Sequence, residues 1–66
     1  MTKNLYLNRK IQLYPGDTYK KFGTITNVDE YGFTVKITEA QPHSGYQKGE
    51  EHFISHSTPF KFKFMN

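Results

Sequence analysis

Hydrophobic and polar residues alternate along most of this chain, and turn residues separate the alternating runs. The clearest run is Phe33 to Ala40, in which Phe, Val and Ile alternate with Thr and Lys. A period of two is typical of a β-strand with one buried face. A second β-rich run, Phe22 to Val28, ends just before Asp29 to Gly32. Because a type I turn favours Asp at its first position and Gly at its fourth, we predict a central hairpin.

Three further runs are predicted to be strands, namely Leu5 to Tyr14, Glu51 to Ser57 and Phe60 to Phe64. In the first of them Arg9 interrupts the apolar positions, which indicates a bulge or bend, or an arginine across the mouth of a barrel. The last run puts three Phe on one face, which predicts core or interface. Its two Lys on the other face protect a sheet edge from aggregation, or meet an anion.

Two other features concern the path of the chain. Gly23 lies inside a strand pattern, which is typical of a bulge or a close backbone approach, and here of the bend that lets a small sheet close. The segment Gln41 to Gly49 is a loop that is longer than a hairpin needs. His43, Tyr46 and Lys48 on this loop are either contact groups or simply exposed residues.

The predicted elements define the fold class. Five short strands and no helix longer than one turn, in 66 residues, predict a single all-β domain spanning residues 1–66. We expect a small, strongly bent, five-stranded antiparallel barrel of the Sm-like or SH3-like kind, or a sandwich. The OB fold ranks third because it normally needs more residues.

Composition narrows the class of protein further. The chain has no Cys, which excludes disulfides and thiolate metal sites and fits the reducing cytoplasm, where we expect the protein to be. No run approaches the ~18 apolar residues of a membrane helix, and no signal peptide opens the chain, so we expect a soluble protein without membrane contact. Domains below about 70 residues often need a partner chain, so self-association is expected.

Catalysis and metal binding are not expected. Ser55, His56 and Ser57 are neighbours on a strand and point to alternate faces, so they do not form a nucleophile–base pair. His52 and His56 lie four residues apart, about 13 Å along a strand, which is too far for one metal ion. We therefore predict a protein that is not an enzyme and holds no cofactor.

Nucleic-acid binding is better supported. The formal net charge is +3, and none of the five Tyr is needed by the apolar alternation. Exposed aromatics beside Lys and Arg bind single strands by stacking on bases and neutralising phosphates, although tyrosines also half-bury their rings over small cores. The candidates are Tyr31 and Tyr19 for stacking, Lys20, Lys21, Lys36 and Arg9 for phosphates, and His52 for a base or sugar contact.

Two stretches resemble the Sm-like family, and its Hfq branch in particular. The matching positions are Gly23, Ile25, Val28, Asp29 and Tyr31 in the first stretch and His52, Ile54 and Ser55 in the second. The resemblance implies a ring in which the fifth strand of one subunit pairs with the fourth strand of the next. It also implies that Tyr31 stacks on RNA bases and that His52 lines the same pore site. Glu51 stands where the Hfq branch has an RNA-contacting lysine, and the loop at 41–49 is longer.

Three functions follow as hypotheses. The first is a non-catalytic barrel that binds nucleic acid, with single-stranded RNA favoured over duplex DNA. The second is a protein-binding adaptor or a small inhibitor of a host enzyme, of the type that phages and mobile elements encode. The third is a homo-oligomer that assembles through the strand Phe60 to Phe64.

Overall fold

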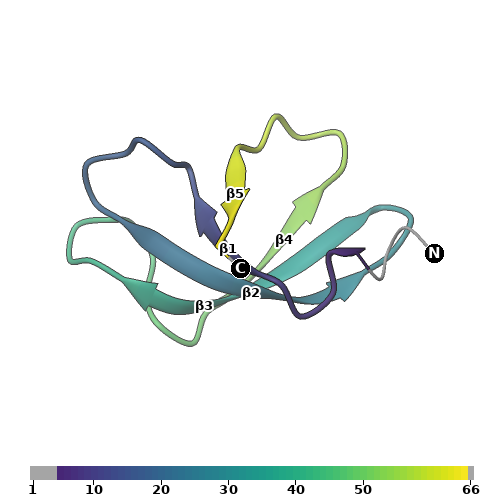
Figure 1. Cartoon of the computed structure of the whole chain (residues 1–66), viewed down its shortest axis with the longest axis horizontal. Helices are drawn as coiled ribbons and strands as arrows, with labels where there is room; N and C mark the ends of the chain where they lie inside the picture. Colours follow the sequence, from purple (N-terminus) through teal and green to yellow (C-terminus); the bar gives the residue numbers. More distant parts are fainter. Residues whose placement is uncertain (1–4, 66) are drawn as a thin grey trace.

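The computed structural model describes residues 5–65, which form one antiparallel sheet. Its strands are β1 (Lys10–Leu13), β2 (Lys21–Val28), β3 (Gly32–Ala40), β4 (Glu51–Ser55) and β5 (Phe62–Phe64). The strand order is β4-β3-β2-β1-β5, so the last strand pairs with the first. The sheet is bent into a trough, with the long β2–β3 hairpin as its base and β1, β5 and β4 rising from it (Figure 1). The prediction of five antiparallel strands is confirmed.

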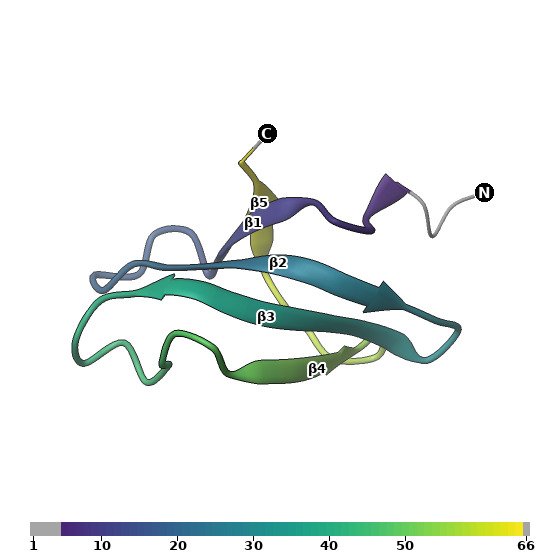
Figure 2. The same cartoon turned by 90° about the horizontal axis from the view of Figure 1, so that it is seen from below.

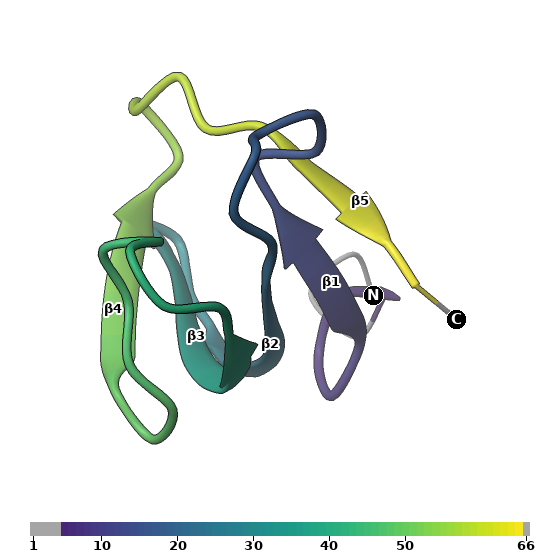
Figure 3. The ribbon, with the colours of Figure 1, turned by 90° about the vertical axis from the view of Figure 1, so that its left-hand side faces the viewer.

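The sheet is not closed into a barrel. In the described part of the chain β4 pairs with β3 alone and β5 with β1 alone. The two edge strands lie on opposite arms of the trough, and residues 56–61 cross from one arm to the other (Figure 3). Aromatic rings connect the crossing segment and β5 to the base of the trough, since the centroid of the Phe33 ring on β3 lies 5.8 Å from those of Phe60 and Phe62.

The core lies on the inner face of the trough. Its fully buried members are Ile11, Leu13, Ile25, Phe33, Val35 and Ile37. They come from β1, β2 and β3 at alternate positions, as a period of two requires. Burying each such side chain contributes about 1.5–3 kcal/mol. Phe60, Phe62 and Phe64 pack against this core and are half-buried, which agrees with the prediction for the last alternating run.

Gly23 of β2 lies at an irregularity in the pairing with β3. The pairing register between β2 and β3 shifts between Phe22 and Gly23. A Cβ on Gly23 would lie 2.5 Å from Cγ1 of Val35 and 2.8 Å from the carbonyl oxygen of Lys36. Only glycine therefore lets β3 pass this close, which confirms the predicted close approach of another backbone.

The turn at Asp29 to Gly32 is held by the Asp29 side chain. Its Oδ1 accepts hydrogen bonds from the backbone N–H groups of Tyr31 (2.8 Å) and Gly32 (3.0 Å). An Asp side chain that bonds its own turn favours a tight connection. The predicted hairpin is confirmed, and the turn leaves the Tyr31 ring 70% exposed.

The first and last strands are shorter than the alternation predicts. β1 begins at Lys10, because Asn8 adopts a positive φ of 64° that turns the chain away from the sheet. Leu5 and Leu7 are consequently exposed, so their assignment to the strand is wrong. β5 likewise spans only residues 62–64, whereas the prediction started it at Phe60.

Candidate nucleic-acid interface

Some of the candidate residues lie at the two ends of the β2–β3 hairpin, and the others lie elsewhere on the sheet. Tyr19 precedes β2 and Tyr31 follows it, and the eight residues of β2 span about 26 Å. Figure 2 shows how this hairpin runs the length of the molecule. We call residues 17–21 and 41–50 the loop end, and residues 29–32 and 55–58 the hairpin end. Tyr19 and Tyr31 therefore do not form one continuous stacking surface.

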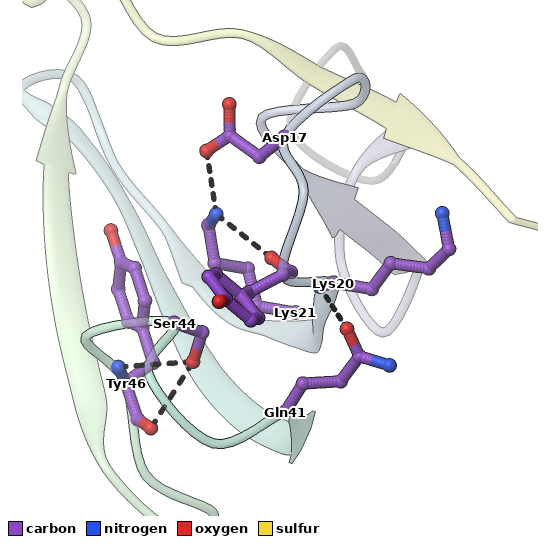
Figure 4. Close-up of polar contacts among 7 residues, drawn as sticks. Asp17, Lys20, Lys21, Gln41, Ser44 and Tyr46 are labelled. Carbon is purple, nitrogen blue, oxygen red and sulfur yellow. Dashed lines mark hydrogen bonds and ion pairs between the residues drawn. The ribbon is translucent and has the colours of Figure 1, made fainter.

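At the loop end, two exposed rings lie side by side. The Tyr19 ring is 45% exposed and its centroid lies 5.8 Å from that of His43, with an angle of 56° between the planes. Gln41 fixes the chain beside them, since its Oε1 accepts from the backbone N–H of Lys20 at 2.7 Å. The Lys20 side chain is exposed and extends away from the cluster (Figure 4).

An open polar pocket of about 340 Å³ lies at this end of the sheet. The residues that line it are Asp17, Thr18, Tyr19, Lys21, His43 and Ser44. Thr18 and Ser44 carry hydroxyl groups on short side chains. The Ser44 hydroxyl accepts a hydrogen bond from the backbone N–H of Tyr46 at 3.3 Å. The pocket thus combines an aromatic rim with hydroxyl, imidazole and charged groups.

Lys21 differs from the other candidate cations because it is buried. Its side chain is only 4% exposed, and Nζ donates to Oδ2 of Asp17 at 2.7 Å and to the carbonyl oxygen of Tyr19 at 3.3 Å (Figure 4). The ammonium also lies 5.5 Å from the Tyr14 ring and 5.9 Å from the Tyr46 ring. Its charge is balanced within the protein, so we do not carry Lys21 forward as a phosphate contact.

Sequence analysis missed this ion pair, although two signals pointed to it. Lys21 shares its position in the alternation with Gly23 and Ile25, which face the core. Asp17 lies four residues before Lys21, close enough for a turn to bring the carboxylate back over the ammonium.

His52 lies on β4, next to the loop end, and is half-buried. Its Nε2 donates to Oε1 of Glu50 at 3.2 Å, and its ring meets that of Tyr46 edge-on at 4.9 Å. Burial, helped by the nearby Tyr14 and by acidic neighbours, raises the pKa of the Tyr46 hydroxyl above its usual value. The Gln47 N–H, followed by the His52 contact, lowers the pKa of the Glu50 carboxyl.

The remaining two candidate cations lie away from both ends. Lys36 is exposed on the outer face of β3, beside Thr24 of β2 and Glu51 of β4. The Arg9 guanidinium lies 4.0 Å above the centre of the Phe64 ring, and Nη1 donates to the carbonyl oxygen of Leu5 at 3.2 Å. Neither side chain is part of the loop-end pocket.

At the hairpin end, His56 holds the turn that carries Tyr31. Its backbone N–H donates to the carbonyl oxygen of Tyr31 at 2.9 Å. Its ring Nε2 donates to the carbonyl oxygen of Asp29 at 3.0 Å. The exposed Tyr31 ring is therefore mounted on a turn that is fixed at two points.

Two classes of feature are not found in the described residues. Within residues 5–65 there is no group of three or more His, Asp or Glu side chains placed to hold a metal ion. The same residues include no helix long and apolar enough to cross a membrane.

The resemblance to the Sm-like family stays a prediction. In one chain, Tyr31 lies at the hairpin end, whereas His52 pairs with Val35 nearer the middle of the sheet. Comparisons with protein-family models, curated proteins and solved structures found no match to this chain.

Proposed function

We propose that the loop end binds single-stranded nucleic acid, with RNA favoured, and that the chain has no catalytic role. The observation that carries the proposal is the pair of exposed rings, Tyr19 and His43, at the rim of an open polar pocket, with the exposed Lys20 next to Tyr19 in the sequence. Any of the bases can stack on such rings, so this contact does not depend on sequence. A nearby lysine neutralises the phosphate.

The other pocket groups fit the sugar of an RNA strand. Thr18 and Ser44 carry hydroxyls that donate and accept hydrogen bonds, which suits the 2′-hydroxyl of ribose. Lys36 and Arg9 supply positive charge elsewhere on the sheet. His52 packs edge-on against the Tyr46 ring of the loop. The net charge of +3 adds a general attraction for polyanions.

Replacing Tyr19 with alanine is expected to weaken binding of a short, labelled single-stranded RNA about tenfold. Stacking on one aromatic side chain contributes about 1–3 kcal/mol per base, and tenfold corresponds to about 1.4 kcal/mol. Fluorescence anisotropy at low salt measures the dissociation constant. Tyr31→Ala is the matched control, because it removes an exposed tyrosine from the other end and is expected to change affinity less than about twofold.

The same assay reports the phosphate contact. Lys20→Gln is expected to reduce the slope of log affinity against log salt by about 0.7, the value for one contact to a single strand. Lys61→Gln, an exposed lysine outside the loop end, is the control. Absence of RNA binding at low salt, or equal losses for Tyr19→Ala and Tyr31→Ala, would overturn the proposal.

Self-assembly is a second candidate, favoured by the open edges of the sheet. In the described chain β4 and β5 each keep one edge unpaired, and Phe53 on β4 is 55% exposed. Pairing of β5 from one copy with β4 of the next is a head-to-tail contact that closes into a ring if the rotation permits. The protein-binding alternative would use the same β4 edge.

Sedimentation equilibrium of the full chain at micromolar concentration tests the assembly. We expect a mass that is a multiple of the monomer mass, and a shift to monomer in Phe53→Lys, which puts a charge beside the exposed edge. Phe53 makes a suitable target because its ring lies outside the buried core. A wild-type monomer across this concentration range would remove the candidate.

A further inference from the structure

A second pocket, of about 210 Å³, lies at the mouth of the trough, and we call it the mouth pocket. Its walls include three aromatic rings, Phe33, Phe60 and Phe62, and its polar side includes Ser55, His56 and Thr58. The pocket opens where β4 and β5 fail to pair, so it is a consequence of the open sheet. None of these residues takes part in the loop-end site.

The aromatic walls form a fixed frame. Phe33 meets Phe60 and Phe62 edge-on, at 5.8 Å with interplanar angles of 62° and 63°. Phe60 and Phe62 are stacked at 5.6 Å with an angle of 24°. A flat ring that enters beside them can make the offset or edge-to-face contacts that aromatic pairs prefer.

The polar side offers both donors and an acceptor. The Ser55 hydroxyl oxygen accepts from the backbone N–H of Ser57 at 3.2 Å, which leaves its proton for donation. His56 Nε2 donates to the carbonyl oxygen of Asp29, so Nδ1 of the neutral ring is an acceptor. The Thr58 hydroxyl can act in either sense.

The volume limits the guest. An engineered apolar cavity of about 150 Å³ accepts a benzene ring, so about 210 Å³ has room for two fused rings. An entirely apolar guest of that size would displace water from the polar side without replacing its hydrogen bonds, which lowers affinity. A heterocycle with donors and acceptors along its edge satisfies both sides of the pocket.

We propose that the mouth pocket binds a single purine base. Adenine presents an acceptor, N7, beside a donor, the N6 amino group, which is complementary to the donor and acceptor of the polar side. The proposal deepens the nucleic-acid function and rests on it only for the source of the base. A free nucleoside and an unstacked base within a strand share this chemistry.

NMR titration of the ¹⁵N-labelled full chain tests the proposal, with adenosine in one arm and a short oligoadenylate in the other. Binding is expected to shift the amide signals of Phe33, Phe60 and residues 55–58. Ser55→Ala and Thr58→Val are each expected to weaken adenosine binding about three- to tenfold, the loss of one hydrogen bond. Lys63→Gln, an exposed lysine that lines neither pocket, is the control and is expected to leave adenosine binding unchanged.

The outcomes separate the possibilities. If adenosine shifts the pocket signals and oligoadenylate does not, the ligand is a free nucleoside. If only oligoadenylate shifts them, the ligand is a base within a strand. No shift of the pocket signals at millimolar concentration of either ligand would overturn the proposal. So would indole, an apolar two-ring probe, binding as tightly as adenosine. Failure of the loop-end proposal has a different signature, because oligoadenylate then leaves the signals of Tyr19 and Lys20 unmoved.

Discussion

Replacing Gly32 with alanine is expected to lower the free energy of unfolding by about 3 kcal/mol, a large share of what a domain of this size possesses. A Cβ at this position would overlap the backbone carbonyl oxygen of Ile54 and lie 2.8 Å from Cζ of Phe53. A side chain can rotate away from such a contact, but a carbonyl oxygen moves only with its strand. The substitution therefore pushes β4 away from β3.

Urea unfolding, followed by circular dichroism, measures the effect, and Gly16→Ala is the matched control. Gly16 has a φ of +102° but no atom within 4 Å of a built Cβ, so alanine there costs only backbone strain, about 1–2 kcal/mol. Gly23→Ala should fall between the two, since its backbone contact, the carbonyl oxygen of Lys36 at 2.8 Å, is less severe than the overlap at Gly32. A loss below about 1 kcal/mol for Gly32→Ala would contradict the close approach of β4.

The parts of the fold that the sequence predicts are those set by neighbouring residues. Alternation over 33–40 places the core face of β3, and the Asp29 side chain closes its own turn two and three residues on. The close approach at Gly23 can be predicted because a glycine inside a strand often marks a place where another backbone passes closely. Each of these inferences uses contacts within one hairpin, where local chemistry decides the geometry.

The parts that the sequence does not predict depend on distant contacts. The interruption at Arg9 indicates a bend, and the chain turns at the neighbouring Asn8, but the alternation at Leu5 and Leu7 does not show that these residues leave the strand. The turn involves a contact with β2, where the Asn8 N–H donates to the carbonyl oxygen of Ile25. The packing of Phe60 and Phe62 against Phe33 brings together residues that are far apart in the sequence. Tyr19 and Tyr31 are far apart because the whole of β2 lies between them. Composition alone does not show whether two aromatic residues share one surface.

The buried ion pair at the loop end gives the second large expected effect. Asp17→Asn leaves the Lys21 ammonium buried with only neutral partners, and we expect the free energy of unfolding to fall by about 1–3 kcal/mol. Breaking a fully buried pair costs about 3–5 kcal/mol, and the smaller figure applies here because Asp17 is 57% exposed and water can replace its carboxylate. Urea unfolding of the full chain measures the loss.

The reciprocal substitution distinguishes burial of charge from loss of a contact. Lys21→Met removes the ammonium and leaves an exposed carboxylate that water solvates, so we expect it to destabilise the protein less than Asp17→Asn. In the double variant the methionine should recover most of the stability that Asp17→Asn removes. A larger loss for Lys21→Met than for Asp17→Asn would mean that the attraction between the charges outweighs the cost of burying the ammonium.

The same pair connects stability with the proposed function. Lys21 Nζ also donates to the carbonyl oxygen of Tyr19, so the ammonium holds the segment that carries the stacking ring. In Lys21→Met the core position is still filled by an apolar side chain, but this hydrogen bond is lost. We therefore expect RNA affinity to fall in Lys21→Met by more than its small stability change predicts. Equal affinity in Lys21→Met and wild type would show that Tyr19 is positioned by its other neighbours, among them the Lys20–Gln41 hydrogen bonds.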